Sequence, residues 1–563
     1  MSNLDSLDKI VSLAKARGFI FQSSEIYGGL SAVYDYGPLG VELKRNIRDA
    51  WWKEMTRRHD NIVGVDAAIF MHPKVWEASG HVGGFNDPMI DDKQSKKRYR
   101  ADMLIEQHIH KLEKKFVDDF FDFVNDSNKI KTEKYRKIIA DVVSSIEEKV
   151  SQVQESYQDS SGVENEVMVS SFNQINKQLK EVDAEFPHPE KFVNQLNEII
   201  GLYYNLLTAG SRKSLTEDLY EIIMENEIRA PESGAFDWTE VRQFNLMFKT
   251  QFGSTSTDED GVYLRPETAQ GIFVNYKNVM DTSRTTIPFG IAQTGKAFRN
   301  EVVARQFVFR MREFEQMEMQ YFVKPGTDEE EYEKWLEKRL EWHKFMGIRE
   351  ENLRTAPHPE DKLAHYARAA ADIQYKYPIG WQEVEGIHNR TDFDLTQHAE
   401  FSGKKLDYFD QKNQERFVPY VIETSVGLDR LTLMVLCDAY REEEVDGDTR
   451  TVLKMNPKLA PTQVGIFPLI KKDKLQDLAH KIEKDLREEF SVLYDDSGSI
   501  GKRYRRQDEA GTPFCVTVDF DGVESEGEDT VTIRYRDDMS QERVPVSKLA
   551  EVIRDGMKDW KPE

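Results

Sequence analysis

The sequence contains little cysteine and no long apolar run. Its 563 residues include only two cysteines, Cys437 and Cys515, which excludes a disulfide framework and a metal site built from paired cysteines. No apolar run approaches the roughly 20 residues that a helix needs to cross a bilayer. The N-terminus also lacks the apolar core of a signal peptide. These absences predict a soluble, cytoplasmic protein with no membrane partner.

Positive charge is also in short supply. Lysine and arginine number 77 against 101 aspartates and glutamates, which gives a formal net charge of −24. This balance argues against a general affinity for nucleic acid, although a local basic patch can still bind it. The length predicts about three or four domains.

Changes in composition divide the chain. Glycine and proline become rare at 106–228, where charged residues and apolar stripes such as Phe116, Phe120 and Phe123 predict a helical insertion. A core in two parts is therefore expected at 1–105 and 229–455. The second part contains a smaller helical insertion at about 327–370 and ends in a charged linker at roughly 438–460. Residues 456–563 alternate strand and helix patterns, which predicts a separate α/β domain.

One stretch, FRNEVVARQFVFRMREFEQMEMQYF at 298–322, predicts two antiparallel strands joined by a loop. Alternation places Arg310, Arg312, Phe314, Gln316 and Glu318 on one face of the second strand. Cations suit phosphates, an aromatic ring suits a base, and carboxylates suit an ammonium group or a metal. This face therefore suits a nucleotide, while a salt-bridged solvent face is the alternative explanation of the same pattern.

Other polar residues stand at the ends of predicted elements. Glu267 lies where a strand gives way to a helix, and Thr268 can cap that helix. Glu423 and Ser425 share one strand face. Arg430 falls in the first turn of the next helix, where the helix dipole disfavours a cation, so an anionic ligand is expected there.

Two further patterns leave alternatives open. An apolar stripe at Leu43, Ile47, Trp51 and Trp52 either packs within its own domain or faces a second subunit. In the tail, the run at 502–506 (KRYRR) concentrates positive charge around one aromatic ring. That combination suits single-stranded RNA, and a solvated helix start is the alternative.

Taken together, these segments resemble the class II aminoacyl-tRNA synthetases, and specifically glycyl-tRNA synthetases of the homodimeric type. The resemblance rests on the order and spacing of YGPLGVELKRNIRDAWW, RADMLIE, RPETAQG, FRNE…FRMREFEQME, ETSVGLDR and YRRQDEAGTPFCVTVD. It covers most of the chain outside 106–228. It implies an α+β fold: a catalytic antiparallel sheet flanked by helices, followed by an α/β anticodon-binding domain. It further implies ATP and Mg²⁺, glycine, tRNA(Gly) and a homodimer.

The resemblance also implies roles for single residues. Arg299 would hold the α-phosphate of ATP, and Phe314 would stack beneath adenine. Arg430 would cover the other face of the base, and Glu383 would help hold Mg²⁺. Glu301 would contact the adenine end or the amino-acid side of the nucleotide, and it joins Arg299 and Arg430 as a catalytic residue.

Three sets of residues follow from the same resemblance. The ATP-binding set comprises Arg299, Asn300, Glu301, Phe309, Arg310, Met311, Arg312, Glu313, Phe314, Glu383, Val384, Gly427, Leu428, Asp429 and Arg430. The glycine-binding set comprises Arg100, Glu267, Phe314, Glu315, Gln316, Met317, Glu318, Glu423, Thr424, Ser425, Val426 and Gly427. The tRNA-binding set comprises Arg503, Arg505 and Arg506. Glu315 alternates to the strand face opposite Phe314, so either it lies behind the pocket or the strand is bulged.

Two other functions fit parts of the pattern. A catalytically inactive, synthetase-like accessory subunit could bind nucleic acid, but it should lack the residues that grip the nucleotide, and these are present. A ligase that joins an amino acid to an acceptor other than tRNA is disfavoured by the intact tail. The 106–228 insertion shows no hydrolytic constellation, so no editing site is expected.

Overall fold

The structure is a computed structural model that describes residues 4 and 6–562, except for 127–188, 211–212, 252–260, 303–305, 360–362, 365, 446 and 524–526. The chain forms two compact units. The first comprises Met1–Ser79, Met247–Pro357 and Tyr366–Glu563, and the second comprises Gly80–Leu246 and His358–His365.

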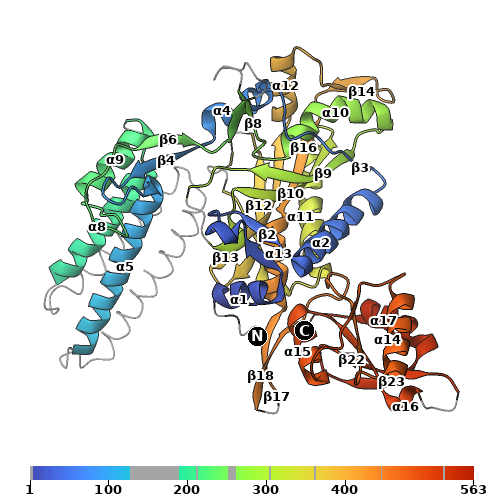
Figure 1. The fold of residues 1–563 in the computed structure, drawn as a ribbon. Coiled ribbons are helices and arrows are strands. Elements are labelled where there is room, and N and C mark those ends of the chain that lie inside the picture. Colours follow the sequence, from blue (N-terminus) through green and yellow to red (C-terminus); the bar gives the residue numbers. More distant parts are fainter. Residues whose placement is uncertain are drawn as a thin grey trace, which may run out of the picture. The chain divides into compact units, whose positions relative to one another are not determined.

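A seven-stranded sheet is the centre of the first unit (Figure 1). Its order is β11 (Leu353–Pro357), β12 (Ala369–Tyr377), β13 (Gly380–Thr391), β16 (Tyr420–Gly427), β10 (Glu313–Val323), β9 (Phe289–Phe298) and β3 (Ile62–Gly64). Every neighbouring pair is antiparallel except β3 and β9. The predicted antiparallel sheet is therefore confirmed, and the 298–322 stretch supplies the end of β9, the loop and most of β10.

One face of this sheet carries the apolar core. Met317, Met319 and Tyr321 alternate along β10 toward helices α2 (Pro38–Arg57), α11 (Asp328–Phe345) and α13 (Leu428–Ala439). Helix α2 begins with a proline, whose fixed φ suits the first helical position. Its Leu43, Ile47 and Trp51 side chains are all fully buried in this core. Three residues of the predicted stripe therefore pack within their own unit, whereas Trp52 is only partly buried.

Helix α11 belongs to the core, although its charged sequence predicts part of a small insertion at 327–370. Trp335 and Trp342 lie in the same hydrophobic cluster as β10. Arg339 and His343 are also buried, and both contact the carboxylate of Glu385 on β13. The internal ion pair explains why the sequence resembles a solvated helix.

The opposite face of the sheet is only partly covered. Helix α10 (Ala269–Ser283), with α12 (Phe393–Ser402) beside it, packs Tyr276 against Phe289 and Phe322, with ring centroids 6.0 and 4.6 Å away. The same face of β10 continues through Glu318, Gln316 and Phe314 beyond this aromatic cluster. Those side chains line a cavity.

The predicted linker at 438–460 contains a hairpin of β17 (Tyr440–Val445) and β18 (Asp448–Leu453). A five-stranded sheet follows, ordered β20 (Val492–Tyr494), β19 (Val464–Pro468), β21 (Phe514–Val518), β22 (Thr530–Tyr535) and β23 (Gln541–Pro545). Its helices are α14 (Asp473–Leu486), α15 (Ile500–Ala510), α16 (Phe520–Val523) and α17 (Leu549–Asp559). The first three strands are parallel and the others antiparallel, so the predicted C-terminal α/β fold is confirmed.

The smaller elements of the first unit are short. They are α1 (Leu7–Arg17), β1 (Ile20–Gln22), β2 (Tyr34–Tyr36), α3 (Lys74–Ala78), β7 (Lys249–Gln251), β8 (Gly261–Tyr263), β14 (Tyr408–Asp410) and β15 (Glu415–Phe417). Single-turn 3₁₀ helices occur at Glu25–Tyr27, Phe307–Phe309, Glu350–Asn352 and Val546–Lys548. The second of these lies in the loop between β9 and β10.

In its described residues, the second unit combines helices with a small sheet. Helices α5 (Ala101–Asp126), α8 (Pro189–Leu207) and α9 (Leu215–Glu225) pack around one core, with the four-residue α4 (His81–Gly84) near its start. Strands β4 (Asn86–Asp91), β5 (Arg98–Arg100) and β6 (Arg242–Asn245) form the sheet. The unit thus extends beyond the predicted insertion at 106–228 on both sides. Residues 127–188 of that prediction, and the side chains of Phe120 and Phe123, lie outside what is described.

Within the described ranges, no helix combines the length and the apolar character that a membrane span requires.

The packing of α2 against the segment after α1 predicts the effect of one substitution. A Cβ on Gly40 would overlap the backbone carbonyl of Phe19, and backbone cannot move aside as a flexible side chain can. Gly40→Ala should therefore lower the free energy of unfolding by about 1–3 kcal/mol, measured from the urea midpoint. Gly501→Ala in α15 is the matched control because nothing lies within 4 Å of its added methyl. An equal loss in both variants would contradict the expected cause.

Candidate functional site

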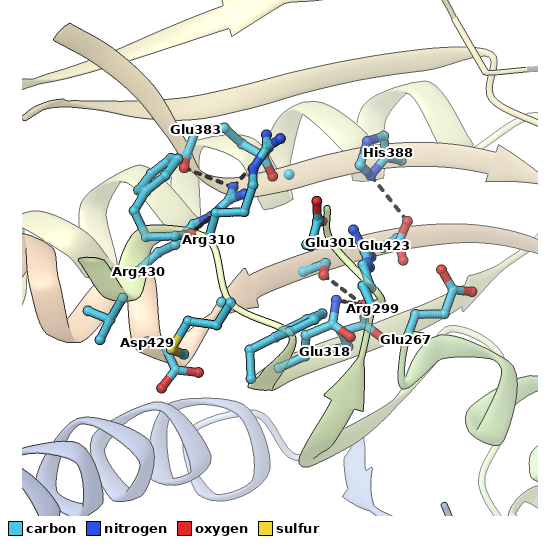
Figure 2. Close-up of a pocket in the computed structure, with 18 of the residues that line it drawn as sticks. Glu267, Arg299, Glu301, Arg310, Glu318, Glu383, His388, Glu423, Asp429 and Arg430 are labelled. Atoms are coloured by element: carbon cyan, nitrogen blue, oxygen red, sulfur yellow. Dashed lines mark hydrogen bonds and ion pairs between the residues drawn. The ribbon is translucent and has the colours of Figure 1, made fainter. Parts of the chain in front are cut away.

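A cavity of about 230 Å³ opens on the face of the central sheet that α10 leaves uncovered (Figure 2). Strands β10, β13 and β16 supply much of its lining, and the β9–β10 loop and the start of α13 supply most of the rest. The lining residues are Glu267, Arg299, Glu301, Val308, Phe309, Arg310, Met311, Phe314, Gln316, Glu318, Tyr366, Glu383, Gly386, His388, Arg390, Glu423, Ser425, Gly427, Asp429 and Arg430.

The strand register explains why these side chains meet. Ser425 on β16 is paired with Glu318 on β10 and with Gly386 on β13. One step along the same face, Glu423 is paired with His388 on β13. Residues two apart on a strand share a face, so antiparallel pairing assembles a polar surface from three distant segments.

Glu318 is a buried carboxyl group with three donors. It accepts hydrogen bonds from Thr268 (2.6 Å), Ser425 (2.7 Å) and Gln316 (3.2 Å). Burial, and then the negative charges of Glu423 and Glu267, raise the pKa of Glu318 to about 8. Without a bound cation this group is mostly protonated at neutral pH. Thr268 stands at the N-cap of α10 as expected, but its hydroxyl donates to Glu318 instead of capping the helix.

Glu423 has the opposite electrostatic environment. Burial alone would raise its pKa, but Arg390 and His388 outweigh burial and hold the pKa of the Glu423 carboxyl well below its usual range. Arg390 donates to Glu423 at 2.9 Å and to Asp394 at 2.8 Å. Its guanidinium also lies 4.0 Å from the ring centroid of Tyr366. Two carboxyl groups on adjacent strands, Glu318 and Glu423, therefore differ in protonation.

Arg430 marks the other end of the cavity. Its guanidinium lies 4.4 Å from the ring centroid of Phe309 and 3.1 Å from the carboxylate of Glu383. The anion that the helix dipole leads us to expect is thus at least partly supplied by the protein. Partial burial opposes ionisation of Glu383, but the charge of Arg430 outweighs it and lowers the pKa of Glu383.

Glu383 reaches the cavity because of a β-bulge. The pairing of β12 with β13 shifts so that Gln374 faces Glu383 and Ile373 faces Glu385, which leaves Val384 without a partner. An extra residue in one strand redirects the side chains on either side of it. Glu383 therefore lines the cavity, while Glu385 lies in the core against Arg339.

Arg299 and Phe314 occupy the middle of the cavity. Nε of Arg299 donates to the carbonyl of Pro266 at 3.0 Å, and its guanidinium carbon lies 5.4 Å from the ring centroid of Phe314. Glu301 follows on the same loop. A guanidinium group beside an open aromatic face suits the phosphate and base of a nucleotide.

Most of the proposed ATP-binding side chains line this cavity, and five do not. Val384 and Leu428 are core residues, and Glu313 pairs with Lys296 at 2.9 Å. Arg312 donates to the carbonyls of Glu301 and Ser31, so it holds the loop in place. Asn300 follows Arg299 but is not part of the lining.

The glycine-binding set needs a similar correction. Met317, Thr424 and Val426 alternate to the opposite face of the sheet, where all three are buried. Glu315 lies behind the pocket, where its carboxylate is 3.3 Å from both Lys44 and Arg48 of α2. Simple strand alternation explains all four positions. The other members, apart from Arg100, line the cavity.

Arg100 belongs to the second unit. There its guanidinium pairs with Asp87 at 3.1 Å and with Asp102 at 2.6 Å. Its role in glycine binding stays a prediction.

The three arginines predicted to bind tRNA have different environments in α15. Arg503 is buried and donates to the backbone carbonyls of Pro468, Asp496 and Gly498, so it stabilises the fold and is not available to an RNA. Arg505 is largely exposed and pairs with Asp448. Arg506 pairs with Asp495.

Sequence reasoning missed five lining residues. Gly386, His388 and Arg390 follow Glu383 on β13, and their even spacing was a usable signal because residues two apart share a strand face. The bulge at Val384 hides their relation to Glu383. Tyr366 and Val308 lie outside regular strands, and no pattern marks them.

Comparison with known proteins identifies the class of protein that has this architecture. Residues 248–440 match the family model "tRNA synthetase class II core domain (G, H, P, S and T)", and 463–556 match "Anticodon binding domain". Residues 87–179 and 133–246 match "Glycyl-tRNA synthetase insertion domain 1". A crystal structure of prolyl-tRNA synthetase from Cryptosporidium parvum shares the fold, with a TM-score of 0.54 and 12% identity over 99% of this chain and 77% of that one. The chain is therefore a class II aminoacyl-tRNA synthetase.

Full-length relatives narrow the family. The glycine–tRNA ligase of Chlorobaculum tepidum is 50% identical over 97% of this chain and 99% of that protein. The glycine–tRNA ligase of Treponema denticola is 45% identical over 99% of this chain and 98% of that protein. The chain belongs to the glycine–tRNA ligase family.

The raised pKa of Glu318 predicts how pH affects stability. Between pH 5 and about 8 the folded protein keeps a proton on Glu318 that the unfolded chain releases, so this group lowers stability as pH rises. Glu318→Gln mimics the protonated form. Relative to the parent protein it should become more stable by up to about 1 kcal/mol per pH unit across this window. Differential scanning calorimetry of the two ligand-free proteins at pH 5, 6, 7 and 8 measures this difference in stability. A constant difference would show that Glu318 is ionised throughout.

Proposed function

We propose that this glycine–tRNA ligase activates glycine with ATP in the cavity on the central sheet and then transfers it to tRNA(Gly). One observation carries the proposal: antiparallel pairing brings an acidic group around Glu318 and Glu423 into the same cavity as Arg299, Phe314 and Arg430. The acidic end suits an ammonium group, and the cationic and aromatic end suits ATP.

The acidic end suits glycine in particular. Glu318, Glu423 and the hydroxyl of Ser425 present oxygen atoms to a small cation, and Glu267 lines the same cavity. Loss of the proton from Glu318 would match the positive charge of a bound ammonium. Glycine has no side chain, so its selection depends on excluding larger amino acids, and a steric clash discriminates better than a missing methylene, which is worth only about 1–3 kcal/mol.

The first step is attack of the glycine carboxylate on the α-phosphate of ATP with release of pyrophosphate. The nucleophile is already ionised, so the protein need not remove a proton. Arg299 would stabilise the charge that gathers on the α-phosphate oxygens, while Phe314 and Arg430 would hold adenine between them. The protein therefore contributes mainly by positioning the two substrates.

The residues present fit a magnesium ion bound together with ATP. In the described part of the chain, no group of three or more His, Cys, Asp or Glu is arranged to hold a metal by itself. Mg²⁺ usually keeps several waters and needs only one or two carboxylates beside substrate phosphates. Glu383, which is half-exposed at the cavity, would supply one of these. The ion would neutralise phosphate charge.

Three finer features complete the proposal. We infer a cytoplasmic homodimer, in which the loop after β1 faces the second subunit, because Ile26 and Tyr27 expose 88% and 87% of their surface. The exposed face of α15, with Arg505 and Arg506, would contact the anticodon end of tRNA(Gly). An inactive accessory role is not supported, because Arg299, Phe314 and Arg430 are all present in the cavity.

Removing the phosphate-binding cation should stop the first step. Arg299→Ala is expected to lower glycine-dependent exchange of pyrophosphate into ATP by at least about 100-fold, because the charge on the α-phosphate is left uncompensated. Binding of tRNA(Gly) should stay within a few-fold of the parent value in a filter-binding assay. Near-normal exchange by this variant would refute both the role of Arg299 and the location of the site.

Substitutions in α15 of the C-terminal domain should impair the charging of tRNA(Gly) and leave the activation of glycine unchanged. Arg505→Ala removes an exposed cation from α15 and should reduce kcat/KM for tRNA(Gly) by about 10-fold while pyrophosphate exchange is retained. Arg554→Ala is the matched control, because Arg554 is an exposed arginine on α17 with an ion pair of its own, to Glu489. If exchange falls together with charging, or if both variants lose charging equally, α15 is not the tRNA-binding surface.

A further inference from the structure

His388 is a cavity residue for which the activation step has no use. It lies on β13, and its side chain is 21% exposed. Nδ1 of His388 lies 3.1 Å from the carboxylate of Glu423 (Figure 2). The neighbouring cation Arg390 keeps Glu423 ionised, as its lowered pKa indicates. An ionised carboxylate therefore lies beside Nδ1 at ion-pair distance, although the two groups are not aligned for a hydrogen bond in this structure.

The short distance favours a hydrogen on Nδ1 of His388, because a nitrogen lone pair facing a carboxylate oxygen would be repelled. When Nδ1 carries the hydrogen, the neutral imidazole has its lone pair on Nε2. A carboxylate that orients an imidazole in this way is the arrangement that lets histidine act as a general base toward a hydroxyl group. Glu423 thus has a second use beside the ammonium of glycine.

The backbone beneath the imidazole ring leaves room for the position that His388 takes beside Glu423. A Cβ on Gly386, two residues earlier on the same face, would lie 2.7 Å from Cε1 of His388. The absence of a side chain at position 386 therefore lets the imidazole lie close over the strand. Ser425 pairs with Gly386, and Glu423 pairs with His388, so the ring stands one step along the strands from the hydroxyl that contacts Glu318.

We propose that His388 is the general base of the second step and takes the proton from the terminal ribose hydroxyl of tRNA. This inference rests on the proposed site of activation. The hydroxyl oxygen attacks the carbonyl carbon of glycyl-adenylate and forms the ester bond. The bond between that carbon and the phosphate oxygen breaks, and AMP leaves with the electron pair. The hydroxyl proton moves to Nε2 and is later released to the departing phosphate or to water.

The two steps differ in their nucleophile, so a general base is needed only in the second step. The first step uses a carboxylate nucleophile and needs no base, whereas the second uses a neutral hydroxyl, which is a weak nucleophile until it loses its proton. General base catalysis contributes typically about 10²–10⁴-fold. Substitution of a residue that acts only in the second step should therefore slow transfer to tRNA and leave pyrophosphate exchange nearly unchanged.

The experiment measures both steps in the full-length enzyme. Enzyme-bound glycyl-adenylate is formed first and then mixed with tRNA(Gly) in a quench-flow instrument, and glycine-dependent pyrophosphate exchange is measured in parallel. His388→Asn keeps an amide donor for Glu423 but cannot accept the proton. It should slow transfer by about 10²–10⁴-fold while the kcat of exchange changes less than about 10-fold and the KM for glycine rises.

Two further variants distinguish a base from a positioning residue. His388→Ala should show the same loss of transfer, and added imidazole should restore part of it. Gly386→Ala should displace the ring and reduce transfer more than exchange. Normal transfer in His388→Asn overturns the inference, and so does an equal loss of exchange and transfer without rescue, because His388 would then only orient Glu423. If instead Arg299→Ala retains exchange, the site itself is misplaced.

Discussion

The site depends on two buried carboxyl groups, Glu318 and Glu423, which lie on neighbouring strands and face the same cavity. Two negative charges this close cannot both be stable without compensation. The protein compensates one of them: Arg390 keeps Glu423 ionised, whereas Glu318 accepts hydrogen bonds from the neutral donors Thr268, Ser425 and Gln316, and its pKa is raised to about 8. Among the described residues, Glu318 therefore lacks a cationic hydrogen-bond donor, and the ammonium group of glycine is the cation that we propose for it. On that proposal, binding of the amino acid and ionisation of Glu318 would be linked.

The sheet makes this arrangement possible because each of its strands serves two purposes. Along β10, Met317, Met319 and Tyr321 form the core with α2, α11 and α13, while Gln316 and Glu318 face the cavity. A shift of one residue in the register would exchange these two sets. The apolar layer therefore fixes the positions of the polar side chains, and the site inherits the rigidity of the core. The cavity opens where α10 begins, since Thr268 at the N-cap of this helix contacts Glu318 in the lining.

Much of the fold and of the cavity lining could be predicted from the sequence, and the predictions that were wrong have identifiable causes. Alternation correctly placed Phe314, Gln316 and Glu318 together, because β10 is regular from Glu313 to Val323. The same rule, applied strictly, places Glu315 and Met317 on the far face, where the structure has them. Charged residues were harder to interpret. Arg503 and Arg339 appear in the sequence as surface cations, yet both are buried, one against backbone carbonyls and the other against Glu385. A sequence cannot distinguish a solvated arginine from one whose partner lies far along the chain.

The bulge at Val384 shows how a local irregularity couples core and cavity. Glu383 and Glu385 are two residues apart and would share a face in a regular strand. The unpaired Val384 separates them, so that Glu385 is held in the core by Arg339 and His343 while Glu383 meets Arg430 at the cavity. A buried ion pair that loses one partner leaves a charge without compensation, at a cost of about 3–5 kcal/mol. The pair on the core side therefore resists any slip of β13, and that resistance keeps Glu383, Gly386 and His388 at fixed positions along the cavity wall.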